Sequence, residues 1–230
     1  MSKSASSYKW GFIIKGPRSA LDYLLQNKNV PWWKLMNRGG EWEAWLPDVQ
    51  HETCPNAQFD LVQQSIVRMN GLLNSRNLPG LIEMTHFVNN EAEQRTVSIP
   101  LPLVIRVTNL GGLGAVKHSF IDFSCIEPAD LSNLKNLMDY WGQPNAETYE
   151  GLYKIYEWIQ SIRHDLVTEI PKKQRERLTH TCNHWSSGPT ARHATRGREP
   201  PKNPMPLREI KQIVMCLSDS YVQSVQSSVA

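Results

Sequence analysis

The chain has 230 residues, of which 40% are hydrophobic and 20% are charged, an ordinary globular composition. It contains no run of 18 apolar residues, so we expect no transmembrane helix. The opening stretch MSKSASSYKW lacks the apolar core of a secretion signal, and the four cysteines are scattered along the chain. We therefore expect an intracellular protein with free thiols, in the cytoplasm, the nucleus or a virion.

The net charge of +3 is distributed unevenly. Residues 1–170 hold 15 Lys and Arg against 18 Asp and Glu, whereas residues 171–230 hold 10 against 4. Such asymmetry is typical of a segment that meets a polyanion, either a nucleic acid or an anionic membrane surface. The alternative is a solvated basic strip without a ligand.

Alternation and helical spacing of apolar residues predict the elements in chain order. Strands are expected at 8–15, 41–46 (an edge strand), 81–88, 96–99 with 103–110, and 118–126. Helices are expected at 19–25, 31–37, 59–73, 130–141 with Asp130 as N-cap, 148–166 opened by Asn145 or Thr148, and 207–225. The fold class is therefore α+β, with a small antiparallel sheet flanked by several helices.

A polar stretch separates the last two helices. Residues 171–206 are basic and contain several Pro and Gly, so we expect an irregular segment there. The predicted organisation is a globular body at 1–170, this basic segment at 171–206, and an interaction helix at 207–230.

The last helix carries an apolar stripe that needs a surface, either on the body of the same chain or on a neighbouring copy. Its residues are Leu207, Ile210, Val214, Leu217 and Tyr221. We favour a neighbouring copy, which predicts a homo-oligomer.

The basic segment gives the leading hypothesis for function. Lys and Arg neutralise phosphates, and Trp and His stack on unpaired bases. The predicted contacts are Lys172, Lys173, Arg175, Arg177, Trp185, Arg192, Arg196, Arg198 and Lys202. We expect a non-enzymatic, self-assembling RNA-binding protein of viral nucleocapsid or matrix type, which contacts phosphates between residues 172 and 211. No cofactor is expected.

A zinc site is an alternative use of the stretch HTCNHW at 180–185. Thiolate and imidazole suit zinc, so His51, Cys54, Cys182 and His184 could form a tetrahedral set, in which His180 could replace His184. The two pairs lie about 128 residues apart and contain no Cys-x-x-Cys knuckle, so chance proximity in the sequence also explains them.

Two further hypotheses come from other classes of protein. The aromatic region at 32–45, with Trp32 and Trp33, could be the interface of a regulatory module that binds a host factor. A metal-dependent nuclease or hydrolase could instead gather carboxylates and imidazoles. Its candidates are Glu83, His86, His118 and Asp122.

The glycine-rich stretch at 109–119 is predicted to be a hairpin loop between two strands. A phosphate-binding loop needs Gly, Lys and Ser or Thr in succession before a helix, whereas two residues separate Gly114 from Lys117 here.

Overall fold

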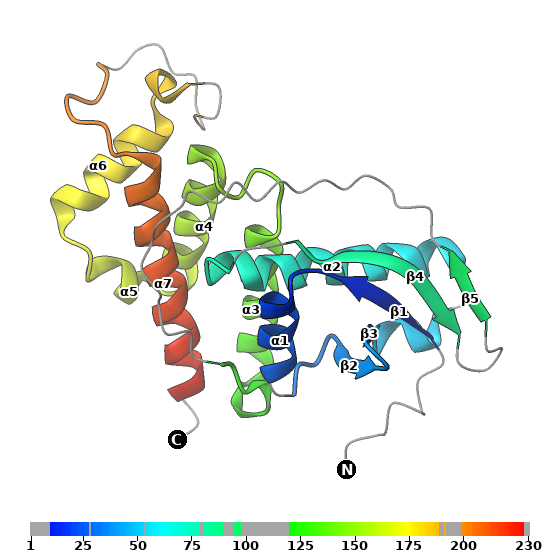
Figure 1. Ribbon diagram of the computed structural model, residues 1–230. Helices are drawn as coiled ribbons and strands as arrows, with labels where there is room; N and C mark the ends of the chain where they lie inside the picture. Colours follow the sequence, from blue (N-terminus) through cyan, green and yellow to red (C-terminus); the bar gives the residue numbers. More distant parts are fainter. Residues whose placement is uncertain are drawn as a thin grey trace.

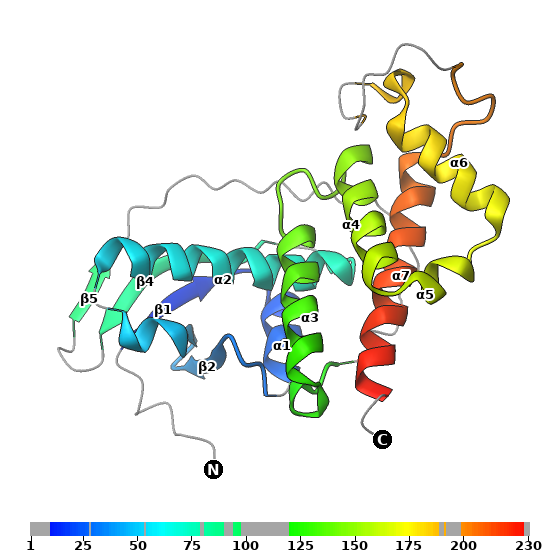
Figure 2. The same ribbon diagram turned by 180° about the vertical axis from the view of Figure 1, so that it is seen from behind.

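The computed structural model describes residues 10–27, 29–52, 54–78, 81–89, 94–97, 120–188, 191 and 199–227. Its architecture is α+β, as the sequence predicts, with an antiparallel sheet at one end and a group of helices at the other (Figure 1). The view from behind shows helix α2 (Pro55–Ser75) reaching from the sheet to the helical group (Figure 2).

In the described part of the chain, the sheet has five antiparallel strands in the order β2-β3-β1-β4-β5. They are β1 (Trp10–Lys15), β2 (Lys34–Arg38), β3 (Glu41–Trp45), β4 (Glu83–Asn89) and β5 (Gln94–Val97). In the central strand, Phe12 pairs with Ala44 on β3 and with Phe87 on β4. The strands predicted at 8–15 and 81–88 are confirmed for their described residues.

A tight hairpin corrects two predictions. Gly39 and Gly40 have φ values of +59° and +93° and join β2 to β3 in a two-residue turn, with Arg38 paired to Glu41. The predicted helix at 31–37 is therefore wrong, because the paired glycines return the chain as a strand. The strand predicted at 41–46 exists, but it lies between β2 and β1 and is not an edge strand.

The two faces of the sheet bury different residues. Phe12 and Ile14 on β1 belong to the main hydrophobic core, which also includes Trp42 and Ala44 on β3. On the other face, Ile13, Trp45 and Val88 form a second, small cluster. Alternation of side chains along each strand produces this division.

The helices largely follow the apolar spacing of the sequence. They are α1 (Arg18–Gln26), α2, α3 (Pro128–Trp141), α4 (Tyr149–Ile162), α5 (His164–Thr168), α6 (Lys172–Asn183) and α7 (Leu207–Ser227). Thr148 caps α4 by accepting a hydrogen bond from the Gly151 N–H, as predicted. Asp130 lies in the first turn of α3, and Glu127 takes the N-cap position.

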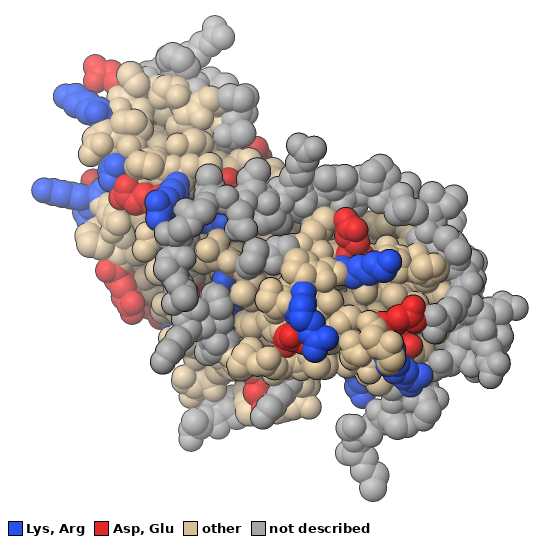
Figure 3. Space-filling model, viewed as in Figure 1, with Lys and Arg blue, Asp and Glu red and all other residues tan. Residues whose placement is uncertain are grey.

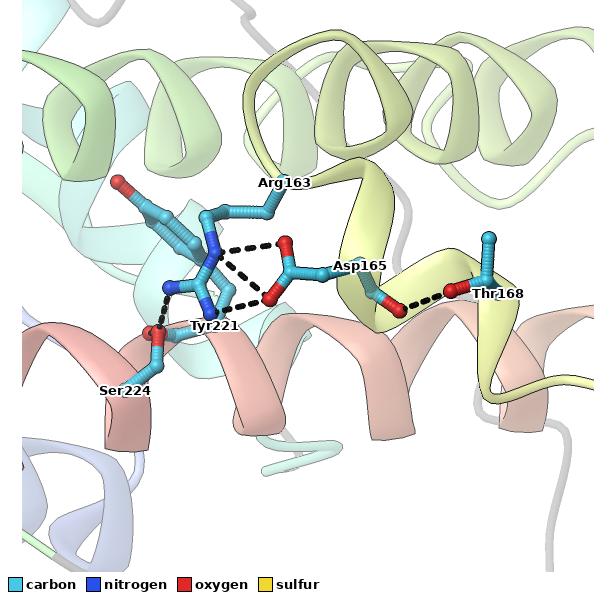
Figure 4. Close-up of polar contacts among 5 residues, drawn as sticks. All are labelled: Arg163, Asp165, Thr168, Tyr221 and Ser224. Atoms are coloured by element: carbon cyan, nitrogen blue, oxygen red, sulfur yellow. Dashed lines mark hydrogen bonds and ion pairs between the residues drawn. The ribbon is translucent and has the colours of Figure 1, made fainter.

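The helix predicted at 148–166 is divided in two at Arg163. This residue has φ −141° and ψ 67°, which ends α4 and starts α5. Its guanidinium donates to both carboxylate oxygens of Asp165, at 2.9 and 2.7 Å, and to Ser224 Oγ on α7, at 2.6 Å (Figure 4). The bend is therefore fixed by charge-assisted hydrogen bonds to two other elements.

The region around residue 120 differs from the prediction. The strand expected at 118–126 is absent from its described part, where Phe123–Cys125 form a short 3-10 helix. The Asp122 side chain caps this turn through the Ser124 N–H, which favours the turn over an extended ladder. The strand predicted at 103–110 and the glycine loop at 109–119 lie outside the described residues.

Two glycines let α2 and α3 approach closely. A methyl group added to Gly71 would overlap the carbonyl oxygen of Met138 on α3. One added to Gly142, just after α3, would overlap the carbonyl oxygen of Val67 on α2. The two backbones are therefore in direct contact, which only residues without a Cβ permit.

Helix α7 is a central part of the helical group. Ile210, Val214 and Tyr221 are at most 1% exposed and pack in the main core. The Lys211 ammonium is also buried and lies 2.7 Å from Glu147 Oε1. The predicted interaction stripe is therefore occupied within the chain, so its assignment as an interface to another copy is wrong.

Replacement of Gly71 by Ala should destabilise the protein by about 3 kcal/mol, because the added methyl group forces α2 away from α3. Urea denaturation followed by circular dichroism measures the change in the free energy of unfolding. Asp60→Ala on the exposed side of α2 is the control and should change it by less than about 0.5 kcal/mol. A loss as small as that of the control would show that the two helices separate readily.

Candidate nucleic-acid interface

The segment predicted to be irregular begins with helix α6. Pro171 takes its N-cap position, and its buried side is formed by Leu178, Thr181 and Cys182. The expectation of irregular structure is wrong for residues 172–183. The apolar signal was weak because Leu178 is the one large aliphatic residue of this helix, while charged side chains cover its exposed positions.

A strap formed by residues 199–206 lies along α6 and leads into α7. The Arg177 guanidinium donates to the carbonyl oxygens of Asn203 and Pro204, at 2.9 and 3.1 Å, and forms an ion pair with Glu209 at 2.9 Å. Thr181 Oγ1 accepts from the Met205 N–H at 2.9 Å. These bonds explain how a polar, proline-containing segment becomes ordered.

A cleft of about 430 Å³ is lined by residues of α4 and α6, two helices of the helical group (Figures 1 and 2). We call it the α4–α6 cleft. Tyr156 and Gln160 line it from α4, and Lys172, Arg175, Glu176, Thr179, His180, Asn183 and His184 line it from α6 and its C-cap. Predicted residues from two hypotheses, RNA binding and zinc binding, thus meet in one concave site.

Arg175 is the central cation of this cleft. Its Nε atom is buried and finds no hydrogen-bond partner among the described residues. Its charge acts on the neighbouring Tyr156, where burial raises the pKa of the phenol and Arg175 opposes that rise. Lys172 is highly exposed and lies 3.9 Å from Glu176, a distance at which the pairing is weak. Both cations therefore remain available to an anion.

The two imidazoles of the cleft have assigned proton positions. His180 Nε2 lies 3.0 Å from the carbonyl oxygen of Glu199, so Nε2 carries a proton and donates it. His184 Nδ1 accepts the Ser186 N–H at 3.1 Å and lies 2.7 Å from Ser186 Oγ. The lone pair of His184 Nδ1 is thus engaged, which leaves this nitrogen unsuited to act as a base or to ligate a metal.

The four predicted zinc ligands are not brought together. His51 and Cys54 are exposed near the start of α2, whereas Cys182 and His184 are buried at the end of α6. Both ribbon views place these two regions at opposite ends of the molecule (Figures 1 and 2). Burial raises the pKa of the Cys182 thiol to about 12, which favours the thiol over the thiolate that zinc requires. Within the described ranges, no group of three His, Cys, Asp or Glu residues is arranged to hold a metal ion.

The residues of the other two hypotheses lie partly in the core and on separate elements. Trp33 is 2% exposed and Trp45 is fully buried, while Trp32 is partly buried against Phe123, so these three side chains do not form an exposed aromatic surface. For the nuclease hypothesis, Glu83 and His86 lie on β4, whereas Asp122 caps the 3-10 helix at 123–125. His118 lies outside the described residues.

The predicted RNA contacts have three different outcomes. Arg177 is used within the chain, as described above, so its assignment as a free phosphate contact is wrong. Lys173 and Lys202 are exposed on α6 and on the strap. Arg192, Arg196 and Arg198 lie outside the described residues; Trp185 begins a 3-10 helix (Trp185–Ser187), and its side chain is outside the description.

Charges on the described surface are mixed. Around α6 and α7, Lys and Arg alternate with Asp and Glu and do not form one continuous patch on the face in view (Figure 3). The described surface in this view therefore offers no general basic strip, and the α4–α6 cleft is the better-defined candidate site for an anion. The neutral residues that line the cleft were not identified from the sequence. Lys172, Arg175, Thr179 and Asn183 recur at helical spacing, so a prediction of helix α6 would have placed them on one face.

Comparisons with known proteins give no assignment. No protein-family model, curated protein or solved structure matches the chain significantly. None of the described helices is long and apolar enough to span a membrane. The function must therefore be argued from the cleft itself.

Arg177→Lys should release the strap, because an ammonium group cannot reproduce the planar fork that contacts two carbonyl oxygens and a carboxylate. We expect exchange of the Met205 amide hydrogen, which donates to Thr181 Oγ1, to become at least about tenfold faster, as expected for the loss of about 1.4 kcal/mol of local stability. Lys173→Arg, on the exposed side of α6, is the matched control. Unchanged exchange in Arg177→Lys would show that other contacts hold the strap.

Cys182 should resist alkylation in the folded protein at pH 8, because its pKa of about 12 and its burial leave almost no accessible thiolate. Cys54, Cys125 and Cys216 are exposed and should react with iodoacetamide. Peptide mass spectrometry after a short exposure distinguishes them. Rapid modification of Cys182 at a rate equal to that of Cys125 would contradict the buried thiol.

Proposed function

We propose that the protein is a non-enzymatic RNA-binding protein and that single-stranded RNA is held in the α4–α6 cleft. The observation that carries this proposal is the Nε atom of Arg175, which is buried without a partner among the described residues, in a cleft that Lys172 also lines. A phosphate between these two cations supplies the missing acceptor. A single strand suits a concave site between two helices better than a duplex does.

The nucleocapsid- or matrix-type role that we propose from the sequence adds self-assembly to RNA binding. The α7 stripe no longer supports that addition, because Ile210, Val214 and Tyr221 are buried in this chain. Light scattering combined with the absorbance ratio at 260 and 280 nm, on protein purified at low salt, reports assembly and bound nucleic acid separately.

The double variant Lys172→Ala with Arg175→Ala should weaken binding to a ten-nucleotide RNA at least about tenfold, through the loss of two phosphate contacts. The slope of log affinity against log salt should become less steep by about 1.4, as for two contacts on a single strand. Fluorescence anisotropy at several salt concentrations measures both quantities. The double variant Lys15→Ala with Lys154→Ala removes the same charge at exposed sites elsewhere and is the control.

Three results would contradict the proposal. They are an absence of RNA binding, an affinity that does not depend on salt, and equal losses in the two double variants. A further contrary result is that the wild-type protein binds phosphatidylserine vesicles and not RNA. If the cleft variant then loses vesicle binding, the same cations contact an anionic membrane surface.

A further inference from the structure

The α4–α6 cleft has two chemically different ends. Lys172 and Arg175 line it near the start of α6, and Asn183 and His184 line it where the helix ends. With 12 residues at 1.5 Å each, α6 is about 18 Å long. A single phosphate group is too small to contact both of its ends. Among the described lining residues, the two cations lie at the start of α6, where the Glu176 carboxylate also lines the cleft.

The far end suits a neutral, hydrogen-bonding group. No Lys or Arg lines the cleft from residue 179 to residue 184. The end of a helix also carries partial negative charge, which disfavours a phosphate at this position. Asn183 offers an amide there, and its Oδ1 atom is buried without a hydrogen-bond partner among the described residues.

An unpartnered amide oxygen requires a donor. The terminal torsion of Asn is soft, so the amide of Asn183 can rotate to present its oxygen or its NH2 group to a ligand in the cleft that it lines. A side-chain amide has a donor and an acceptor side by side and forms paired hydrogen bonds with the edge of a nucleobase. A phosphate has no such donor to offer, and neither does polyphosphate or a lipid phosphate.

We propose that the cleft takes a nucleotide unit, with its phosphate between Lys172 and Arg175 and the edge of its base on Asn183. This inference rests on the proposed function, and it narrows the ligand from polyanions in general to phosphate joined to a base. Asn183 is then a specificity-determining residue, whereas the two cations supply affinity for any phosphate chain.

The test compares two ligands of equal charge. A ten-nucleotide RNA and an abasic ribose-phosphate strand of the same length are titrated against wild-type protein at fixed salt. We expect the RNA to bind roughly tenfold more tightly, as is usual for contacts to one or two bases. In Asn183→Ala this ratio should fall below about threefold, and the affinity for the abasic strand should not change.

Asn136→Ala on the exposed side of α3 is the matched control and should keep the wild-type ratio. Thermal melting checks that Asn183→Ala folds; its side-chain oxygen makes no hydrogen bond among the described residues, so we expect little change. Equal binding of the two strands by wild-type protein would overturn the base site, and so would a tenfold ratio that persists in Asn183→Ala. In both cases salt-dependent binding that needs Lys172 and Arg175 would leave the proposed function standing, whereas its loss would remove both.

Discussion

The contact of α2 with α3 at Gly71 and Gly142 is the constraint on which the rest of the molecule depends. Helix α2 covers the sheet with one part of its length and meets the helical group with the other. Close approach of the backbones fixes the angle and distance at which the two parts join. Polar bonds then secure the junction: Asn74 Nδ2 donates to the Trp141 carbonyl oxygen at 3.0 Å, and the Trp141 indole N–H donates to Ser218 Oγ at 3.1 Å.

Helix α7 connects the α2–α3 contact to the α4–α6 cleft through ion pairs. Arg76, the C-cap residue of α2, forms an ion pair with Asp219 on α7, and the buried Lys211 pairs with Glu147 between α3 and α4. Buried charges are costly unless paired, so these contacts are specific for one packing of the helices. At the other end of α7, Glu209 holds Arg177 and thereby α6. The cleft is thus positioned through a chain of contacts that begins at the α2–α3 crossing.

The elements that the sequence predicts correctly are those whose apolar pattern is visible within the element itself. The strand at 10–15 and the helices at 59–73 and 207–225 carry strong apolar patterns, and all three are present. The β2–β3 hairpin replaces the helix predicted at 31–37: Pro31 suits the first turn of a helix, but the Gly-Gly pair at 39–40 is the local signal that the fold follows. Helix α6 could not be found in this way: it is stabilised by tertiary contacts of Leu178 and Arg177 with elements distant in the sequence. Of the predicted site residues, Lys172, Arg175 and His184 line the same cleft. The spacing of charges in the sequence does not distinguish the two cations from Arg177, whose hydrogen bonds stabilise the fold.

The contrast between Arg175 and Arg177 is the strongest physical argument for a ligand in the cleft. Both lie on α6, two positions apart, yet Arg177 donates to two carbonyl oxygens and a carboxylate while the Arg175 Nε donates to nothing among the described residues. An unsatisfied buried donor costs about 1–3 kcal/mol, and the Asn183 oxygen in the same cleft carries a similar penalty. Both of these atoms belong to residues that line one cleft, where a bound partner can remove the two penalties together. Because the donor lies near the cationic end and the acceptor near the neutral end, a partner that satisfies both must itself be polar and asymmetric, as a nucleotide is.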